Sequence, residues 1–278
     1  MLKLAYWNLH KNPATAPYLE SIALDLQLQK ENVFFCLAEV SGVDIESVAK
    51  NLNLNSGKNW KCERSKNKLM AYLSNCPGIE PGEENGRAWP ITLNRIIKKT
   101  LTRVNVWIVH LRSPSHSFEP GNVQSNEIID LIKSVSTFEL DSSSMDTIII
   151  GDFNMSPFAP PMINPKGLNA VMCRKIASQK SRKLNGEDYP FFYNPTWHLL
   201  GDQTNSSHPG TFYKDNDPGD STYWHMIDQI VVRPGLMSYI NPKGFRVLTA
   251  TKTGPLLTNG KIDLTISDHL PIIAEMSI

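Results

Sequence analysis

Apolar residues recur along this chain in two different periods, and together these periods predict a mixed α/β protein. Alternation with a period of two over residues 2–8 and 104–110 predicts strands, and the apolar run at 147–150 predicts a buried strand. Apolar residues at helical spacing over 18–26 and 122–140 predict amphipathic helices. The second helix falls between two predicted strands, which is a strand–helix–strand signal. Further strands are expected at 33–40, 60–64, 69–74, 91–97, 226–232, 245–248 and 272–278, with a short helix at 43–54.

Segments rich in proline and glycine separate these elements. Residues 77–86 and 111–121 are therefore expected to be loops, and 155–165 is expected to be irregular. Residues 168–183 are expected to be helical at their start. No repeat, low-complexity tract or long linker interrupts the chain, so a single domain over residues 1–278 is expected.

Composition and charge narrow the class of protein. The chain has 278 residues, of which 41% are hydrophobic and 20% charged, which is an ordinary composition for a globular protein. The net charge of +1 is too small for the electrostatic field of the whole protein to predict a polyanionic partner, so any basic binding surface must be local. We find no signal peptide and no long apolar run, so no stable membrane association is expected. The four cysteines lack metal-type spacing, and a reducing cytoplasm is the default expectation, although a secreted chain without its leader would look the same.

Polar residues stand at the ends of many of the predicted strands. Considered alone, each one is better explained as an ordinary turn residue, a solvated side chain or a structural residue than as a functional one. Gathered at one sheet edge, however, so many polar groups have no stability rationale, because buried charges cost several kcal/mol unless they are paired or bound to metal. The set consists of Asn8, Glu39, His110, Asp152, Asn154, Asp228, Asp268 and His269.

A basic stretch precedes an aromatic one in the second half of the chain. Residues 189–197 are dense in aromatic side chains and include Trp197. Basic residues beside aromatics suit a nucleic-acid strand, which they hold by charge and base stacking. The alternatives remain open, because most charge runs are solvated faces and aromatics beside prolines often only hold a loop in place. The candidates for substrate binding are Arg174, Lys180, Arg182, Lys183 and Trp197.

The order and spacing of these residues resemble a known family, the endonuclease/exonuclease/phosphatase superfamily. That superfamily includes deoxyribonuclease I, exonuclease III, inositol polyphosphate 5-phosphatases and neutral sphingomyelinases. The resemblance covers essentially the whole chain. It implies a four-layer α/β sandwich, with two mixed β-sheets packed face to face and helices on the outside, and phosphoester hydrolysis with a divalent cation. The motifs that carry it are Trp7-Asn8, Ala38-Glu39, His110-Leu111, Gly151-Asp152-Phe153-Asn154, Ile227-Asp228 and Ser267-Asp268-His269.

The resemblance also implies roles for the individual residues. Glu39 would be the principal ligand of Mg²⁺ or Mn²⁺, with Asn8 nearby and Asp268 contributing to the same or a second position. Mg²⁺ prefers oxygen ligands and keeps room for water and substrate. The implied catalytic residues are Asp152 and Asn154, which would position the water and the phosphate, His269 as general base or hydrogen-bond donor, Asp228 to orient its ring, and His110 across the phosphate.

Three functions are compatible with this sequence. The first hypothesis is a metal-dependent nuclease that hydrolyses DNA or RNA through in-line attack of an activated water. The alternative is a phosphatase or phospholipase C-type phosphoesterase acting on a phosphoinositide, sphingomyelin or a small phosphoester. A minor alternative is a catalytically inactive binding module. The sequence does not distinguish DNA from RNA, endo- from exonucleolytic cleavage, or one oligomeric state from another.

Overall fold

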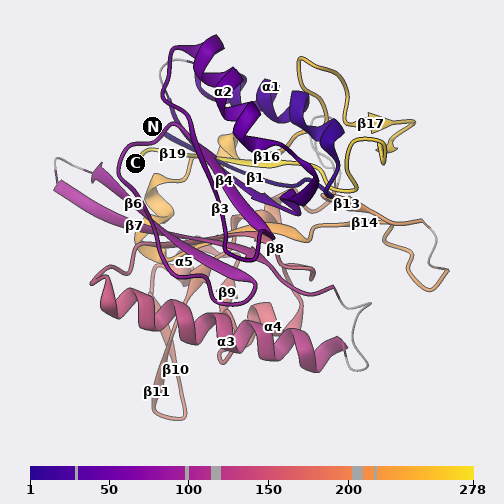
Figure 1. Ribbon diagram of the computed structural model, residues 1–278. Helices are drawn as coiled ribbons and strands as arrows, with labels where there is room; N and C mark the ends of the chain where they lie inside the picture. The colour runs from indigo at the N-terminus through magenta and orange to yellow at the C-terminus, as the bar shows by residue number, and fades with distance from the viewer. Residues whose placement is uncertain (29–30, 98–99, 114–119, 202–208, 216–217) are drawn as a thin grey trace. The chain divides into compact units, whose positions relative to one another are not determined.

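The computed structural model describes residues 1–28, 31–97, 100–113, 120–201, 209–215 and 218–278 (Figure 1). The chain divides into two compact units, each built from separate stretches of sequence. Unit 1 consists of residues 1–77, 199–228 and 240–278, and unit 2 of residues 78–198 and 229–239. The expectation of a single domain stays a prediction. Most of the loop predicted at 111–121 lies outside the described residues.

A six-stranded mixed sheet forms the centre of unit 1, with the strand order β16-β19-β1-β2-β4-β3. The β1–β2 pair is parallel and its neighbours are antiparallel. β2 is apolar almost throughout and fully buried after its first residue, as expected of a strand covered on both faces. The bounds are β1 (Leu2–Asn8), β2 (Asn32–Ala38), β3 (Lys61–Arg64), β4 (Met70–Ser74), β16 (Arg246–Val247) and β19 (Ile272–Met276).

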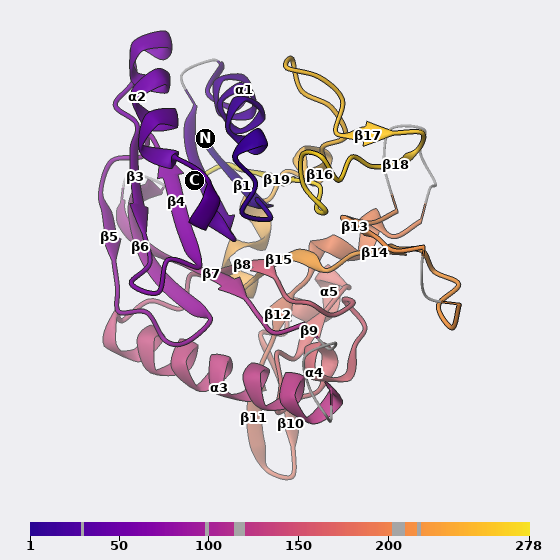
Figure 2. The ribbon, with the colours of Figure 1, turned by 45° about the vertical axis from the view of Figure 1, so that its right-hand side comes forward.

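Unit 1 also contains the helices α1 and α2 and two small hairpins. Helices α1 (Ala16–Leu26) and α2 (Ile45–Ser56) lie side by side along the six-stranded sheet (Figure 2). The Asp44 side chain caps α2 by accepting from Ser47 N, and Gly57 ends the helix in the left-handed conformation. The hairpins pair β13 (Phe212–Tyr213) with β14 (Trp224–His225), and β17 (Leu257–Thr258) with β18 (Lys261–Ile262).

A seven-stranded mixed sheet forms the centre of unit 2, with the order β5-β6-β7-β8-β15-β12-β9. The central pair β7–β8 is parallel, and the helix α3 (Pro120–Asp141) connects the two strands. This is the strand–helix–strand arrangement that the periodicity predicts. The bounds are β5 (Ile79–Pro81), β6 (Ala88–Ile97), β7 (Thr100–His110), β8 (Thr147–Asp152), β9 (Ala170–Val171), β12 (Phe192–Tyr193) and β15 (Asp228–Val232).

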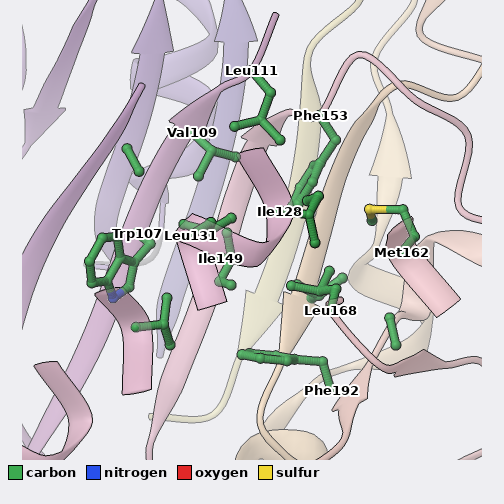
Figure 3. Packing of buried hydrophobic residues seen from close by; sticks show 14 of the residues in the cluster. Trp107, Val109, Leu111, Ile128, Leu131, Ile149, Phe153, Met162, Leu168 and Phe192 are labelled. Atoms are coloured by element: carbon green, nitrogen blue, oxygen red, sulfur yellow. The ribbon is translucent and has the colours of Figure 1, made fainter. Parts of the chain in front are cut away.

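The core between α3 and the seven-stranded sheet contains the residues on one face of β7 and β8, and the alternate residues of these strands lie on the opposite face. Trp107 and Val109 of β7 and Ile149 of β8 pack against Ile128 and Leu131 of α3, and all five are buried (Figure 3). Fully burying such a side chain contributes about 1.5–3 kcal/mol. Because successive strand residues point to opposite faces, the even-numbered residues of both strands lie on the face away from α3. His110 and Asp152, which are partners in the strand register, are the last of them.

Gly151 allows β8 to pass close to β7 one residue before Asp152. Its φ is +155°, and a Cβ at this position would lie 2.0 Å from the Val109 backbone oxygen. A residue with a side chain would therefore push the end of β8 away from β7. This glycine sets the position from which Asp152 leaves the sheet.

The basic stretch at 168–183 is not helical at its start, where β9 (Ala170–Val171) lies, which corrects the expectation from the sequence. Its only helix among the described residues is the four-residue α5 (Arg174–Ala177), after which β10 (Ser181–Leu184) pairs with β11 (Glu187–Pro190). This hairpin extends past α3 in both ribbon views (Figures 1 and 2). Asn185 and Gly186 form its turn with φ values of +51° and +85°, as expected for a tight hairpin. The remaining short helix of unit 2 is α4 (Pro160–Ile163).

None of the helices in the described part of the chain is both long and apolar enough to cross a membrane.

Candidate active site

Asn8 and Glu39 lie at the carboxyl ends of two neighbouring parallel strands in unit 1. In the β1–β2 register Asn8 is opposite Ala38, and Glu39 is the first residue after β2. Strands β1 and β2 continue side by side beyond the sheet, because Lys11 N donates to the Glu39 backbone oxygen at 2.8 Å. An amide oxygen and a carboxylate therefore leave the sheet at the same edge. The Glu39 side chain is 21% exposed, with Lys11 Nζ at 3.8 Å from its Oε2.

The turns that follow both strands hold their backbones in a strained conformation. Glu39 has φ +51°, and His10 and Lys11 have +49° and +54°, values that residues with a side chain seldom adopt. Gly42 allows the turns to approach, because a Cβ there would lie 1.8 Å from the Lys11 backbone oxygen. Strain of this kind costs about 1–3 kcal/mol per residue and is concentrated at functional sites.

The Ser267-Asp268-His269 segment is held against the end of β1. Ser267 Oγ donates to the Asn8 backbone oxygen at 2.8 Å and accepts from His269 N at 3.1 Å. Trp7 Nε1 donates to the His269 backbone oxygen at 2.8 Å. The bonds from Ser267 Oγ to Asn8 and from Trp7 to His269 join residues about 260 positions apart in the sequence. They bring Asp268 and His269 to the sheet edge that carries Asn8.

A buried hydrogen bond links His269 to Asp228. His269 Nδ1 donates to Asp228 Oδ2 at 2.8 Å, with the His269 side chain 6% and the Asp228 side chain 0% exposed. Because an ionised carboxylate only accepts, this bond places the proton of a neutral ring on Nδ1 and leaves Nε2 basic. Thr211 Oγ1 accepts from Asp228 N at 3.2 Å and fixes the backbone of the carboxylate.

The donors in unit 1 fit a hard divalent cation. Asn8 Oδ1 accepts one hydrogen bond, from His10 N at 3.0 Å, and an amide oxygen has a second lone pair for another partner. Within the described part of the chain, Asp268 Oδ1 makes ionic contacts without a hydrogen bond, 3.2 Å from His10 Nδ1 and 3.9 Å from His269 Nε2. Asp228 Oδ1 is buried without a hydrogen-bond partner among the described residues, as expected where a polar group awaits water or a ligand. Oxygen donors of this kind suit Mg²⁺ and Mn²⁺.

His110 and Asp152 meet at the ends of β7 and β8 in unit 2. They are register partners, with 8% and 1% of each residue exposed. His110 Nε2 lies 3.9 Å from Asp152 Oδ2, which is too long for a hydrogen bond. The backbone around both residues is paired, because Leu111 N donates to the Asp152 backbone oxygen and His110 N to that of Arg87. The pair is therefore a fixed feature of the sheet edge.

Asn154 lies in the turn after β8, two residues past the end of the strand. Its Nδ2 donates to the Leu111 backbone oxygen at 2.8 Å and to Asp152 Oδ2 at 3.0 Å, and its backbone N donates to Asp152 Oδ1 at 2.7 Å. Its φ is +52°. Asn154 thus orients both oxygens of the Asp152 carboxylate and bridges the ends of β7 and β8.

Several residues that support these groups did not stand out in the sequence. Buried Gln229 donates to the Met155 backbone oxygen at 2.6 Å and accepts from Asn194 at 2.9 Å, and Gln124 donates to the Asn154 backbone oxygen at 2.8 Å. They hold the turn that follows β8 from two sides. The position of Gln229 as a polar residue within an apolar strand was a signal in the sequence, whereas no sequence pattern marked Gln124.

The basic candidates lie in unit 2 and differ in how they are used. Arg174 is committed to the fold, because its Nη1 donates to the Met237 backbone oxygen at 2.8 Å and its guanidinium lies 5.0 Å from the Tyr193 ring centroid. Lys180 and Lys183 are exposed, and Arg182 is exposed with one 3.3 Å hydrogen bond to the Ile163 backbone oxygen. The exposed charges are therefore on and beside the β10–β11 hairpin.

The aromatic stretch at 189–197 is largely buried. Phe191, Phe192 and Tyr193 are at most 8% exposed, which favours the structural interpretation of this stretch. Trp197 is partly exposed and its ring lies 5.8 Å from that of Phe158, which is 55% exposed. Trp197 is thus the member of the stretch that could still meet a ligand.

The sequence of the chain matches a family model. Residues 5–269 match the Endonuclease/Exonuclease/phosphatase family. The chain belongs to this family, whose members are metal-dependent phosphoesterases. Both the recognition of the family and the prediction of a metal-dependent phosphoesterase are confirmed at this level. No curated protein matches the sequence.

Solved structures match the chain over its full length at low sequence identity. The human Nocturnin catalytic domain is 15% identical with a TM-score of 0.55, covering 99% of this chain and 94% of that one. An AP endonuclease from Archaeoglobus fulgidus is 13% identical with a TM-score of 0.57, covering 100% of both chains. A 3′ phosphatase from Neisseria, bound to a product DNA hairpin, is 14% identical with a TM-score of 0.53, also covering 100% of both chains. These matches confirm the predicted fold class, the deoxyribonuclease I-like α/β sandwich with two large mixed sheets and helices around them.

Proposed function

We propose that this protein is a divalent-metal-dependent nuclease that hydrolyses phosphodiester bonds of nucleic acid. The observation that carries the proposal is the buried 2.8 Å hydrogen bond between His269 Nδ1 and Asp228 Oδ2. A histidine whose tautomer is set by a buried carboxylate has a basic Nε2 that can take a proton from water. A completely buried carboxylate gains little stability from such a pair, because desolvation offsets most of the attraction, and this favours a functional role.

The cation would be held by the oxygen donors of unit 1. Glu39 is the proposed principal ligand, with Asn8 beside it and Asp268 contributing to the same or a second position. When bound, Mg²⁺ or Mn²⁺ neutralises negative charge on the phosphate oxygens during attack. His269 takes the proton from the attacking water at Nε2, and Asp228 stabilises the imidazolium that results.

The polar residues of unit 2 would act on the water and the phosphate. Asp152 is proposed to orient the attacking water, with both of its oxygens already directed by Asn154. His110 is proposed to donate a hydrogen bond to a phosphate oxygen. Preorganised donors of this kind stabilise developing charge without reorganising during the reaction.

Two observations favour nucleic acid as the substrate. One structural neighbour is an AP endonuclease, and another was solved with a product DNA hairpin. The exposed Lys180, Arg182 and Lys183 provide local positive charge that can follow a phosphate backbone although the net charge is only +1. Arg174 and Trp197 are proposed to support this surface.

We also propose a cytoplasmic location, with which the four free cysteines agree.

The test is cleavage of plasmid DNA, single-stranded DNA and RNA in Mg²⁺ or Mn²⁺, with and without chelator. Wild type is compared with Glu39→Gln and His269→Ala, and with Glu46→Gln as a matched control. Glu46 is an acidic residue of the same unit whose carboxylate pairs with Arg64 at 3.0 Å. We expect chelator-sensitive cleavage that Glu39→Gln and His269→Ala lower by at least about 100-fold, whereas Glu46→Gln cleaves like wild type.

Cation binding gives a readout that does not depend on cleavage. Mg²⁺ or Mn²⁺ should raise the thermal unfolding midpoint of wild type and of Glu46→Gln, because a ligand of the folded state stabilises it by mass action. The rise should be absent or much smaller in Glu39→Gln. An equal rise in all three proteins would exclude Glu39 as the principal ligand.

The second candidate is a phosphatase, favoured by the neighbour that is a 3′ phosphatase. If no polymer is cut but inorganic phosphate is released from a 3′-phosphorylated oligonucleotide or a small phosphoester, this alternative replaces the nuclease. Charge reversal of Lys180, Arg182 and Lys183 tests the nuclease proposal directly. It should weaken nucleic-acid binding and reduce the salt slope by up to about 3, because each of these side chains would neutralise one backbone phosphate.

A further inference from the structure

The β13–β14 hairpin of unit 1 carries aromatic side chains and contacts His269 through Phe212. Phe212 forms a β-bridge with His269, and the centroids of the two rings are 5.2 Å apart. Leu270 N donates to the Thr211 backbone oxygen at 2.8 Å. The hairpin is therefore joined, through backbone and ring contacts, to the segment that carries the proposed general base.

Further aromatic side chains lie on the other face of the hairpin, because Tyr213 follows Phe212 in β13 and successive strand residues point to opposite faces. Tyr213 is opposite Trp224 in the hairpin register, with ring centroids 5.0 Å apart in an edge arrangement. Tyr213 also stacks on Tyr223, at 6.3 Å and an interplanar angle of 21°. Tyr223 is 48% exposed, and Tyr213 and Trp224 are partly exposed. We call Tyr213, Tyr223 and Trp224 the aromatic platform.

A second hairpin holds Tyr213 in place. Lys261 of β18 has its Nζ 5.4 Å from the Tyr213 ring centroid and pairs with Asp215 at 2.6 Å. The hydrogen bond to Asp215 raises the pKa of Lys261, and the same bond lowers the pKa of Asp215. An exposed ion pair adds little to stability. Its effect here is to fix the lysine, and through it the ring, before any ligand arrives.

The backbone of Tyr223 carries an independent sign of function. Its φ is +54°, where a bulky residue is an outlier and where glycine or asparagine would fit without strain. Folding alone gives no reason for a half-exposed tyrosine at such a position, because an exposed ring gains little from burial. Strain at an exposed aromatic residue is typical of a ligand-contacting position.

We propose that the aromatic platform is a stacking subsite for an unpaired nucleobase of the substrate, so that the preferred substrate is single-stranded nucleic acid. This inference rests on the proposed nuclease function. Every base presents a π-face, and stacking on an aromatic side chain is largely independent of sequence. A paired base in a duplex is already stacked on its neighbours and has no face to offer.

The experiment compares kcat/KM on a single-stranded oligonucleotide with kcat/KM on the same sequence as a blunt duplex. The variants are Tyr223→Asn, which removes the ring but tolerates a positive φ, and Tyr223→Phe, which keeps the ring. Tyr18→Leu, on α1 of the same unit and partly exposed, is the matched control. Thermal unfolding midpoints show that each variant folds.

We expect Tyr223→Asn to lower kcat/KM on the single strand at least about fivefold, with little change on the duplex. Tyr223→Phe and Tyr18→Leu should behave like wild type. An unchanged ratio of single-strand to duplex cleavage in folded Tyr223→Asn, or an equal loss on both, would overturn the inference while wild-type cleavage still supports a nuclease. Failure of the nuclease proposal itself would appear in wild type, which would cut neither polymer.

Discussion

Asp228 and His269 are 41 residues apart in the sequence, yet Asp228 Oδ2 accepts a buried hydrogen bond from His269 Nδ1 at 2.8 Å. The carboxylate is completely buried and the histidine almost so. Burying both groups adds little to stability, because desolvation offsets most of the attraction between them. The pair is therefore better explained by a role in function. The predictions below begin with this pair.

Asp228→Asn is expected to lower kcat by about 10²- to 10⁴-fold. The asparagine amide can donate to Nδ1, which favours the tautomer with its proton on Nε2 and removes the base. The pH–rate profile of the residual activity should lose the limb that reports deprotonation of His269. Unchanged kcat with an unchanged profile would show that Asp228 only supports the fold.

Asn154→Gly should reduce activity without a large loss of stability. Glycine adopts the φ of +52° without strain but removes the donor to Leu111 and Asp152. Asn154→Ala removes the same bonds and adds about 1–2 kcal/mol of backbone strain. Activity should therefore fall similarly in both variants, whereas urea unfolding should separate them. Full activity in Asn154→Gly would mean that Asp152 keeps its position without the amide.

The buried pair of Glu139 and Arg233 is expected to be the most sensitive ion pair of unit 2 to single substitutions. Arg233 donates through Nε and Nη2 to the two Glu139 oxygens at 2.8 and 2.9 Å and lies 4.0 Å from the Phe192 ring centroid. Glu139→Gln should cost about 3–5 kcal/mol in urea unfolding, because it leaves a buried cation without a counter-charge. The double variant Glu139→Gln with Arg233→Met should cost less than the sum of the two single variants. Additive losses would show that the pair is not coupled.

Glu275 is expected to stabilise unit 1 at neutral pH and not in acid. Burial raises the pKa of Glu275, but hydrogen bonds from Lys3 and Arg246 outweigh this effect and hold the pKa below its usual value. The lowered pKa means that the folded state favours the carboxylate. The contribution is therefore present above the unfolded pKa of about 4.3 and is lost as the pH falls through the folded value.

Glu275→Gln tests this dependence. It should cost about 1–3 kcal/mol in urea unfolding at pH 7, and the difference from wild type should shrink near pH 3. Glu187→Gln, an exposed residue of the β10–β11 hairpin, should show little change at either pH. A difference for Glu275→Gln that persists in acid would point to lost packing instead of lost charge.

Much of the fold was predictable from local periodicity. The alternation over β1 and β7 and the helical spacing of α3 were sufficient because each reflects burial of one face of one element. The prediction of a helix at the start of 168–183 was wrong, because β9 lies there and the short helix α5 begins only at Arg174. The Asn185-Gly186 pair is typical of a hairpin turn, but the basic residues before it lack the apolar–polar alternation that predicts a strand.

The candidate site was predictable as a set of residues but not as an arrangement. The sequence by itself determined which side chains end the apolar strands, among them Asn8, Glu39 and Asp152, because strand ends follow from local patterning. Only the tertiary structure decided that Asp228 partners His269, that Asn154 directs Asp152, and that Trp7 and Asn8 anchor the Ser267-Asp268-His269 segment. These hydrogen bonds depend on where distant segments of the chain meet within each unit and on glycines that let backbones approach. Local hydrophobic periodicity predicts neither the meeting of distant segments nor the close approach of two backbones.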